Sequence, residues 1–325
     1  MKYTIGFDGG ATKTRCVLGD TQGNILANIE AGPSNHQIIG INETKNTLKT
    51  LLDEVLSNAH LKLEDIEFIF LGLAGADLPS DFDMLNGICK DLFKDVAYEV
   101  ANDAWIIMRS GTSEPFGAVS IYGTGANAGA INLDGDMKIL RSLSYNLGGA
   151  GGGSEIANDA LHYAFRSNEE TYTKSALETE LPKHLNMDSI ETLLDKIYPQ
   201  YNLEHSDYTK IPPLVFKLAK EGDLVCQEIL TQKGKVQGQM VNGVIKQANM
   251  IGTKFPVVLG GSVYKGESHY FIDAMKRTIL EQSPQATFNY PKLQPVAGAY
   301  LFSLDRLHIK LSNDESQHLS QQLSL

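Results

Sequence analysis

The sequence predicts an α/β protein built from two similar halves. Short β-type runs alternate with amphipathic helical patterns along the chain, as α/β folds require. The pattern of the opening residues returns about 115 positions later. Glycine-rich turns follow predicted strands at residues 9–10, 123–125, 148–153 and 260–261. A chain of 325 residues is long enough for about two domains.

The first half opens with three short β-type runs, which contain Ile5 and Phe7, Cys16 and Leu18, and Ile25 and Ala27. Turn residues separate these runs, which indicates an antiparallel meander. Helices and strands then alternate, with apolar spacing that distinguishes them: helix 48–59, strand 66–71, helix 85–92, strand 98–100 and helix 104–108.

An internal repeat relates the two halves. Residues 5–11 match residues 120–126, since each segment is a strand that enters a glycine turn, and residues 17–20 match 132–135 at the same offset. Two hairpins can also resemble one another by chance. A duplication explains both the match and the alternation of elements, and it predicts an N-terminal lobe at 1–115 and a C-terminal lobe at 116–325.

The second half is mostly helical after its meander. Residues 156–165 form a helical stripe behind the glycine run, with Ser154 as the expected N-cap. Residues 166–213 are polar, and we assign them to surface helices without chemistry. The other expected elements are helix 224–248, strand 256–259, helix 269–280 and a last helix at about 295–310 that packs back on the N-terminal lobe. The polar tail 312–325 is expected to fray.

Composition narrows the class of protein. The chain has 28 lysines and arginines against 39 aspartates and glutamates, a net charge of −11 at pH 7, which disfavours nucleic acid and anionic membranes as partners. The longest apolar stretch, residues 68–76, is less than half of the ~20 residues that a membrane span needs. The three cysteines are far apart and indicate buried reduced thiols. These features predict a soluble cytoplasmic protein.

The glycine turns suggest phosphate binding, because backbone N–H groups can approach phosphate oxygens where no Cβ intervenes. Any one of these turns alone is explained as a tight turn, but four in a duplicated α/β framework favour a nucleotide site. The sequence lacks a P-loop, since the pair Gly234-Lys235 is followed by Val236. Residues 123–128 fit G-x-G-x-x-A, yet they lead into a predicted strand rather than a helix, which argues against dinucleotide binding.

Four segments together resemble a known superfamily, the actin-like ATPases that include sugar kinases, heat-shock chaperones and actin. The segment Asp8-Gly9-Gly10-Ala11-Thr12-Lys13-Thr14 resembles the first phosphate motif, Gly123-Thr124-Gly125 the second, and Gly260-Gly261-Ser262 the adenosine motif. Residues 31–36 resemble the sugar-side loop of N-acetylglucosamine kinases and of the BadF/BadG/BcrA/BcrD-type ATPase family. The resemblance implies a two-lobed, ribonuclease H-like fold, in which each lobe is a mixed β-sheet flanked by helices and the lobes close on a central cleft.

The resemblance also implies roles for individual residues. Asp8 would hold Mg²⁺, and Gly9, Gly10, Ala11 and Thr12 would embrace the phosphates of ATP; Lys13 would add charge, although a solvated lysine explains it equally well. Asp103 would be the catalytic base, and the alternative is that it caps the helix at Ala104. The sugar-binding residues implied in this way are Asn35, for which an Asx-turn is the alternative, His36, Gly75, Asp77 and Asn102.

One segment departs from the family pattern. N-acetylglucosamine kinases carry a tryptophan and an Asp-Glu pair where this chain has residues 142–153; Gly149-Ala150 replaces the pair, and the sole tryptophan is Trp105. The leading hypothesis is ATP-dependent phosphorylation of a sugar or amino-sugar hydroxyl, with Mg²⁺, by an enzyme that takes a small-molecule sugar as substrate. The family resemblance also implies a homodimer. The alternatives are a nucleotide- or sugar-binding regulator without turnover, and a BadF/BadG-type activating ATPase.

Overall fold

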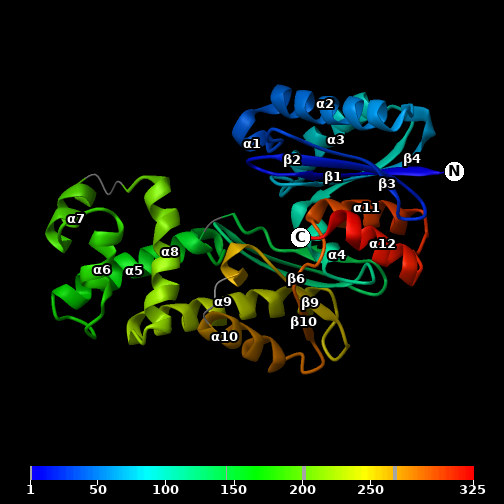
Figure 1. The fold of residues 1–325 in the computed structure, drawn as a ribbon. Helices are drawn as coiled ribbons and strands as arrows, with labels where there is room; N and C mark the ends of the chain where they lie inside the picture. Colours follow the sequence, from blue (N-terminus) through cyan, green and yellow to red (C-terminus); the bar gives the residue numbers. More distant parts are fainter. Residues whose placement is uncertain (1, 144, 200–202, 266–268) are drawn as a thin grey trace.

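The computed structural model describes residues 2–143, 145–199, 203–265 and 269–325. Its framework is a pair of five-stranded mixed sheets, one in each lobe (Figure 1). The strands of the first sheet are β1 (Tyr3–Gly9), β2 (Thr14–Asp20), β3 (Ile25–Ala31), β4 (Ile66–Leu73) and β5 (Ala97–Asn102). Those of the second are β6 (Gly117–Tyr122), β7 (Ala126–Ile131), β8 (Met137–Ile139), β9 (Pro256–Gly260) and β10 (Thr287–Asn289).

The two sheets have the same topology. Their orders are β3-β2-β1-β4-β5 and β8-β7-β6-β9-β10, the second read from its β8 edge. In each sheet the first three strands form an antiparallel meander, and the last two run parallel to the first strand. The predicted α/β class and the duplicated meander are therefore confirmed. The sequence analysis missed β10, because three residues are too few to carry a period.

Helices cover both faces of the first sheet. α2 (Ile41–Ala59) and α3 (Pro79–Phe93) pack on one face, while α4 (Asp103–Ser110) and α11 (Pro295–Arg306) pack on the other (Figure 1). α1 (His36–Ile39) and the 3₁₀ turn η1 (Leu63–Asp65) lie at the ends of α2. α11 is buried on all sides, and it contacts α4 as well as β1, β2 and β4. The placement of the lobe boundary between residues 115 and 116 stays a prediction.

α4 lies between the two sheets. Its residues pack in one core cluster with Val119 and Val258 of the second sheet and with Phe302 of α11. Two glycines permit this close packing: a Cβ on Gly72 would lie 2.6 Å from Ile106, and a Cβ on Gly298 would overlap the Ile106 carbonyl oxygen. The first residue of α4 is thereby held where the two lobes meet.

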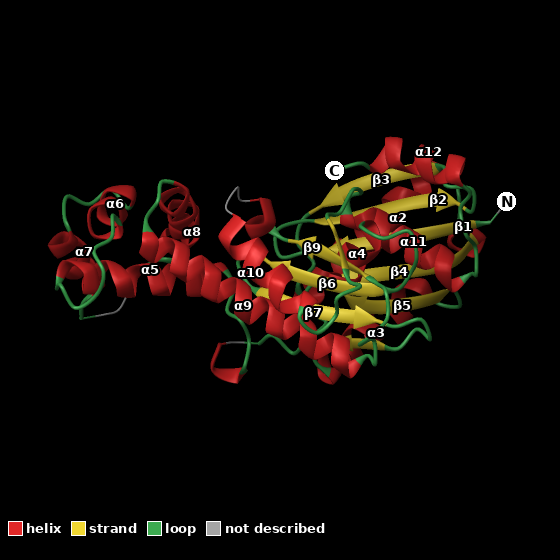
Figure 2. Ribbon diagram, turned by 90° about the horizontal axis from the view of Figure 1, so that it is seen from below, coloured by secondary structure: helices red, strands yellow, loops and turns green. Residues whose placement is uncertain are grey.

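The second lobe carries a helical extension. α9 (Leu224–Gln247) and α10 (His269–Leu280) pack together beside the second sheet. α5 (Gly153–Asn168), α6 (Leu177–His184), α7 (Ile190–Ile197) and α8 (His205–Lys220) form the part that projects to one side in Figures 1 and 2. Two short 3₁₀ turns complete the lobe, η2 (Tyr145–Leu147) and η3 (Ser262–Lys265). The expectation of helices within 166–213 is confirmed for the described residues, which exclude 200–202.

The prediction that Ser154 caps α5 was wrong. The helix begins at Gly153, and Gly152 is its N-cap with φ +68°. A side chain at position 152 would meet the backbone of Gly125 at 2.5 Å. Glycine is required there because the turn 123–125 passes directly against it, a tertiary contact that local capping rules cannot anticipate.

The prediction that the C-terminal tail frays was also wrong. Residues 313–323 form α12 (Asn313–Leu323), which begins with a capping box of Ser312 and Glu315. Leu319 and Leu323 are buried against α11, and the Gln322 side chain bonds the backbone of β3 and of the preceding turn. Leu319 and Leu323 are four residues apart and therefore lie on the same face of the helix. Their burial stabilises α12 although the segment is polar on average. The preceding helix ends at Arg306 rather than near 310.

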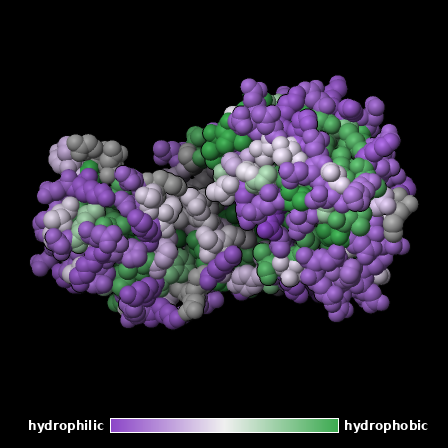
Figure 3. All heavy atoms as spheres, turned by 45° about the horizontal axis from the view of Figure 1, so that its top comes forward, coloured by the Kyte–Doolittle hydropathy of each residue, from purple (hydrophilic) through white to green (hydrophobic). Residues whose placement is uncertain are grey.

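The remaining bulk features agree with the composition. Cys16, Cys89 and Cys226 are buried free thiols, as predicted. In the part of the chain that the structure describes, no helix is long and apolar enough to cross a membrane. Figure 3 shows a mostly hydrophilic face with a hollow between the first lobe and the helical extension.

Candidate active site

The ends of three strands place the candidate catalytic residues side by side. Gly9 of β1 pairs with Leu73 of β4, and Leu73 pairs with Asn102 of β5, all in parallel register. Ligands of open α/β sheets bind beyond the carboxyl ends of such strands. Asp8 and Asp103 stand at this edge of the first sheet, and Asp77 follows β4 by a few residues.

Asp103 is the first residue of α4, and the cap of that helix is its neighbour. The Asn102 side chain accepts a hydrogen bond from the Ala104 N–H at 3.0 Å, so the alternative reading of Asp103 as the N-cap is wrong. Burial, reinforced by the negative charges of Asp8 and Asp77, raises the pKa of Asp103 from 3.8 to about 7. A carboxylate with a pKa near neutrality is suited to accept a proton.

Asp8 is a second carboxylate whose pKa is raised by burial. Its pKa is raised from 3.8 to about 6 by burial, which the positive charges of Arg15 and Lys13 only partly offset. Both cations also bond Glu30, with Arg15 Nε at 2.6 Å and Lys13 Nζ at 3.0 Å from the carboxylate. The Lys13 side chain is exposed and engaged with Glu30. A cation bound beside Asp8 would offset the cost of ionising a buried carboxyl and so lower its pKa.

The loop predicted to bind sugar wraps around Gly75. The Asn35 side chain accepts from the Gln37 N–H at 2.9 Å and caps α1, so the Asx-type reading of Asn35 is confirmed. Gly75 has φ +87°, and a Cβ there would lie 2.8 Å from Asn35 Oδ1. Glycine at position 75 thus lets the loop after β4 lie against the loop before α1.

Two further hydrogen bonds link this loop to the catalytic edge. Asn102 Nδ2 donates to Asp77 Oδ1 at 2.9 Å and to the Ala76 carbonyl at 3.3 Å. His36 Nε2 lies 3.2 Å from Asp81 Oδ1, and the Asp81 carboxylate also accepts from the Leu78 N–H at 2.8 Å. His36 Nδ1 is buried without a partner among the described residues. Asn102, Asp77 and His36 therefore belong to one polar cluster beside Asp103.

In the second lobe, three glycine segments meet at the ends of β6 and β9. The Gly153 N–H donates to the Gly123 carbonyl at 2.8 Å, and the Gly123 N–H donates to the Gly125 carbonyl at 2.8 Å. Gly261 has φ +107°, and a Cβ there would overlap the Tyr122 carbonyl oxygen. The turn 123–125, the end of the glycine run and the turn 260–262 are thereby in direct contact.

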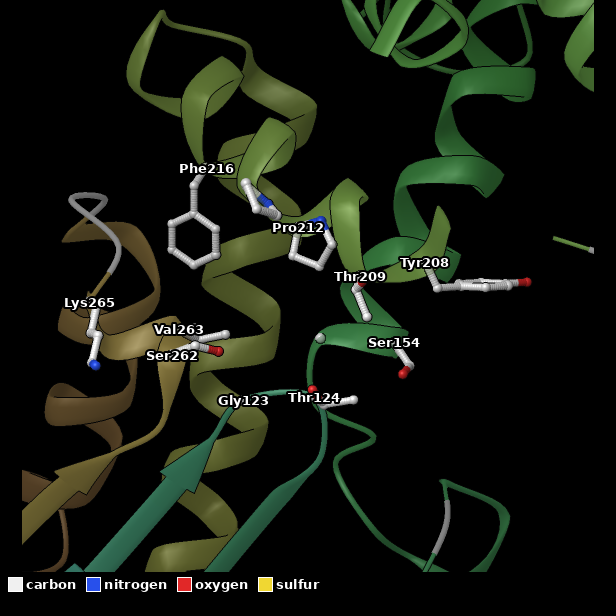
Figure 4. A pocket seen from close by; sticks show the side chains of 12 residues that line it. Gly123, Thr124, Ser154, Tyr208, Thr209, Pro212, Phe216, Ser262, Val263 and Lys265 are labelled. Atoms are coloured by element: carbon white, nitrogen blue, oxygen red, sulfur yellow. The ribbon is translucent and has the colours of Figure 1, made fainter. Parts of the chain in front are cut away.

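A cavity of about 410 Å³ opens above these turns (Figure 4). Gly123, Thr124, Ser262 and Val263 line its floor, and Lys265 adds a positive charge to its wall. In Figure 4 the rings of Pro212 and Phe216 lie across the cavity from Gly123 and Thr124. A mostly apolar cavity of this size with a few polar groups is typical of a site for a small organic ligand.

The sequence analysis missed the wall of this cavity that α8 supplies. Tyr208, Thr209, Pro212, Pro213 and Phe216 all line it, although the segment up to 213 was assigned no chemistry. The proline pair inside a helical pattern was the available signal, because prolines in a helix interior mark an irregularity that packing must support.

The predicted site residues therefore form two groups. The first group comprises Asp8 to Lys13, Asn35, His36, Gly75, Asp77, Asn102 and Asp103, and the second comprises 123–125 and 260–262. Of the described residues, only those of the second lobe line the cavity, and Gly123, Thr124 and Ser262 are the predicted residues among them. Among the described residues no three His, Cys, Asp or Glu side chains are grouped so that they could hold a metal.

The fold defines the class of protein. Two sheets of the same order, which meet at α4 and carry glycine turns at their strand ends, form the two-lobed actin-like ATPase fold. The chain is similar over 93% of its length to a protein from Chromobacterium violaceum provisionally named an N-acetylglucosamine kinase, at TM-score 0.68 and 19% identity, with 98% of that chain covered. It is also similar over 94% of its length to the ROK hexokinase of Thermus thermophilus, at TM-score 0.56 and 15% identity, with 99% covered.

Sequence comparison then gives the family. The profile of the BadF/BadG/BcrA/BcrD ATPase family matches residues 5–303, and the chain belongs to this family. It is 28% identical to N-acetyl-D-glucosamine kinase of Dictyostelium discoideum, over 93% of this chain and 97% of the relative. It is 27% identical to N-acetylmuramic acid/N-acetylglucosamine kinase of Clostridium acetobutylicum, over 91% of this chain and 94% of the relative.

Proposed function

We propose that this protein is an ATP-dependent kinase that phosphorylates a hydroxyl of an N-acetylated amino sugar. The observation that carries the proposal is Asp103, a carboxylate at the end of β5 with a pKa near 7, beside a polar loop and between two lobes. Both curated relatives are kinases of N-acetylated amino sugars and match nearly the whole chain. N-acetylglucosamine and N-acetylmuramic acid are therefore the first acceptors to test.

In the proposed reaction Asp103 accepts the proton of the attacking sugar hydroxyl. Phosphoryl transfer depends mainly on positioning and charge neutralisation, so one correctly placed carboxylate is a sufficient base. Asn102 supports this geometry, because its side chain caps α4 on one side and holds Asp77 on the other. Asp77, Asn35 and His36 would contact the sugar hydroxyls and fix the acceptor next to Asp103.

ATP would lie between the two lobes. The amides of Ala11, Thr12, Thr124 and Gly125 would donate to the phosphates. The N–H groups of Gly10 and Gly123 already bond carbonyls within the two turns. The turn 260–262 and the cavity beside α8 would hold the adenosine. Phe216 offers an aromatic face to the base, and Lys265 offers a positive charge near Ser262.

Asp8 fits a role beside Mg²⁺. A buried carboxylate with a raised pKa lacks sufficient positive charge around it, and Mg²⁺ is held in such sites by one or two carboxylates together with waters and substrate phosphates. The absence of a group of three potential ligands among the described residues agrees with that mode rather than with a protein-only cage. Mg²⁺, when bound, supplies charge neutralisation to the phosphates.

The test is ADP release with ATP and Mg²⁺ over a panel of hexoses, hexosamines and N-acetylated hexosamines, with Asp103→Ala as the matched control. Release that depends on an N-acetylated sugar and disappears in the variant is the expected result. ATP binding with no turnover on any sugar would favour the regulator reading instead. Release without any acceptor, at equal rate in the variant, would favour an activating ATPase.

A further inference from the structure

Buried polar side chains form a chain beneath the turn 123–125. Gln237 of α9 and Ser120 of β6 are fully buried, and Tyr264 of η3 is 4% exposed. Gln237 Nε2 lies 2.8 Å from Ser120 Oγ, and Ser120 Oγ lies 2.6 Å from the Tyr264 hydroxyl. The Tyr264 hydroxyl lies 3.0 Å from Met275 Sδ. Polar groups at this depth are costly unless they are hydrogen-bonded, so their arrangement is informative.

The two ends of this chain have fixed roles. The Gln237 amide nitrogen can only donate, and the thioether of Met275 can only accept. The Ser120 oxygen therefore accepts from Gln237. Met275 Sδ lies 3.0 Å from the Tyr264 hydroxyl and 3.6 Å from Ser120 Oγ, so either hydroxyl can be the donor in the bond that joins them. The removal of any one member leaves a buried partner unpaired.

Gln237 also donates hydrogen bonds to both strands that flank the turn, β6 and β7. Its Nε2 lies 3.0 Å from the Asn127 carbonyl and 3.4 Å from the Ile121 carbonyl. Ile121 and Asn127 are cross-strand partners, one pair below the last pair before the turn. One buried amide thus links the arms of the hairpin that carries Gly123, Thr124 and Gly125.

The other end of the chain reaches the second turn of the cavity. Tyr264 follows Ser262 by two residues in the same 3₁₀ turn, and its bond to Ser120 ties that turn to β6. The two turns also touch directly, since Gly261 packs against the Tyr122 backbone and Gly123 lies beside Ser262. The chain from Gln237 to Tyr264 therefore fixes the spacing between the two turns at which the cavity opens.

We propose that Gln237 is a positioning residue for the nucleotide, which acts through Ser120 and Tyr264 by holding the turn 123–125 and the turn 260–262 at the separation that ATP requires. The inference rests on the proposed nucleotide site. Gln237 touches no substrate itself, because it lies below the hairpin and does not line the cavity. Its loss weakens ATP binding, while sugar binding in the first lobe is unaffected.

α9 offers a matched control for this proposal. Asn242, also buried, donates from Nδ2 to the Thr278 carbonyl of α10 at 2.8 Å. Its Oδ1, like Gln237 Oε1, has no hydrogen-bond partner among the described residues. The two amides thus lie on the same helix, are both buried and each leave the side-chain oxygen unpaired, but only Gln237 reaches the hairpin. Gln237→Met removes an amide nitrogen with three acceptors at the hairpin, and Asn242→Leu removes one with a single acceptor on α10.

The experiment is calorimetric titration of ATP with Mg²⁺ into the full-length wild type, Gln237→Met, Tyr264→Phe and Asn242→Leu, with melting temperatures and steady-state kinetics on the same preparations. We expect Kd and KM for ATP to rise about tenfold in Gln237→Met and several-fold in Tyr264→Phe, with KM for the sugar unchanged. Asn242→Leu should lower the melting temperature but keep Kd within twofold of wild type.

Wild-type Kd values in folded Gln237→Met would overturn the inference, and so would an equal loss of ATP affinity in Asn242→Leu. If Gln237→Met does not fold, Tyr264→Phe decides, because it deletes a single oxygen atom and leaves the ring contact with Phe271 in place. Wild-type protein that binds no ATP would overturn the proposed function itself. That outcome is distinct, since the first two require that the wild type bind.

Discussion

Replacement of Asp103 by asparagine should abolish turnover and at the same time stabilise the protein. Asparagine has nearly the same shape but cannot accept the proton, so we expect kcat to fall by about 10²–10⁴-fold, the usual contribution of a general base. The stability effect has the opposite sign because the ionised carboxylate is held in a buried position next to Asp8 and Asp77. Catalytic residues often carry such a stability cost.

The size of the stability gain follows from the raised pKa of Asp103. The folded value of about 7 lies above the ordinary 3.8, and each pH unit of difference corresponds to about 1.4 kcal/mol, which gives an upper bound of about 4 kcal/mol for full ionisation. Asp103 is mostly but not completely buried, so solvent screening reduces this upper bound, and we expect about 1–3 kcal/mol at pH 8. That increase corresponds to a melting temperature a few degrees higher.

The pH dependence identifies the cause. Between about pH 4 and pH 7 the folded protein holds the Asp103 proton more tightly than the unfolded chain, so this group's contribution to stability falls as pH rises through that window. The gain in Asp103→Asn should therefore be largest at pH 8 and shrink toward pH 5. Thermal unfolding of both proteins from pH 5 to pH 8 measures it.

Asp81 provides the control of opposite sign. Burial raises its pKa, but the hydrogen bonds from the Leu78 N–H, His36 and the Asp77 N–H outweigh burial and leave the pKa below its ordinary value. Asp81→Asn should thus destabilise the protein, by an amount that hardly changes between pH 5 and pH 8. A destabilised Asp103→Asn at pH 8, or a gain that is the same at every pH, would refute the reasoning.

Three further predictions concern other parts of the site and fold. Asp8→Asn should weaken the dependence of ATP affinity on Mg²⁺ by about tenfold or more, as measured by Mg²⁺ titration; an unchanged dependence would remove Asp8 from the metal site. Gly261→Ala should abolish ATP binding and lower the free energy of unfolding by about 1–3 kcal/mol, because it adds a clash with the Tyr122 backbone to a strained φ. The control is Gly252→Ala, which should keep ATP affinity, because Gly252 also has a positive φ but has open space around it. Leu319→Ala should lower the free energy of unfolding by about 2–4 kcal/mol in urea titration; no change would mean that α12 is frayed.

Local patterns predicted most of the fold, and the resemblance to family motifs predicted the candidate residues. The repeat of residues 5–11 at 120–126 predicted two halves that open with the same meander, because a strand and its turn are encoded within a few neighbouring residues. The structure shows that the whole five-strand order is shared. The positions of Asp8 and Asp103 at strand ends follow from the same local information. The family motifs lie in these turns, since the turns are where backbone and side chains reach a ligand.

The errors share a cause. The segment of α12 was expected to fray because its residues are polar on average. Leu319 and Leu323 pack on α11, which lies next to them only in the folded protein. The cap of α5 was misplaced because the residue at position 152 is decided by its contact with the turn 123–125, where only glycine fits, and not by the capping preference of the helix. In both segments a contact between residues distant in sequence outweighs the local preference.

The sequence by itself determined the duplicated α/β framework, the glycine turns and the carboxylates at the strand ends, because each depends on short-range spacing. Only the tertiary structure decided which groups act together. It assigned the cap of α4 to Asn102, brought Asp8 and Asp77 close enough to raise the pKa of Asp103, and added Phe216 of α8 to the cavity wall. Burial and charge interactions depend on distances through space, and a linear pattern does not contain them.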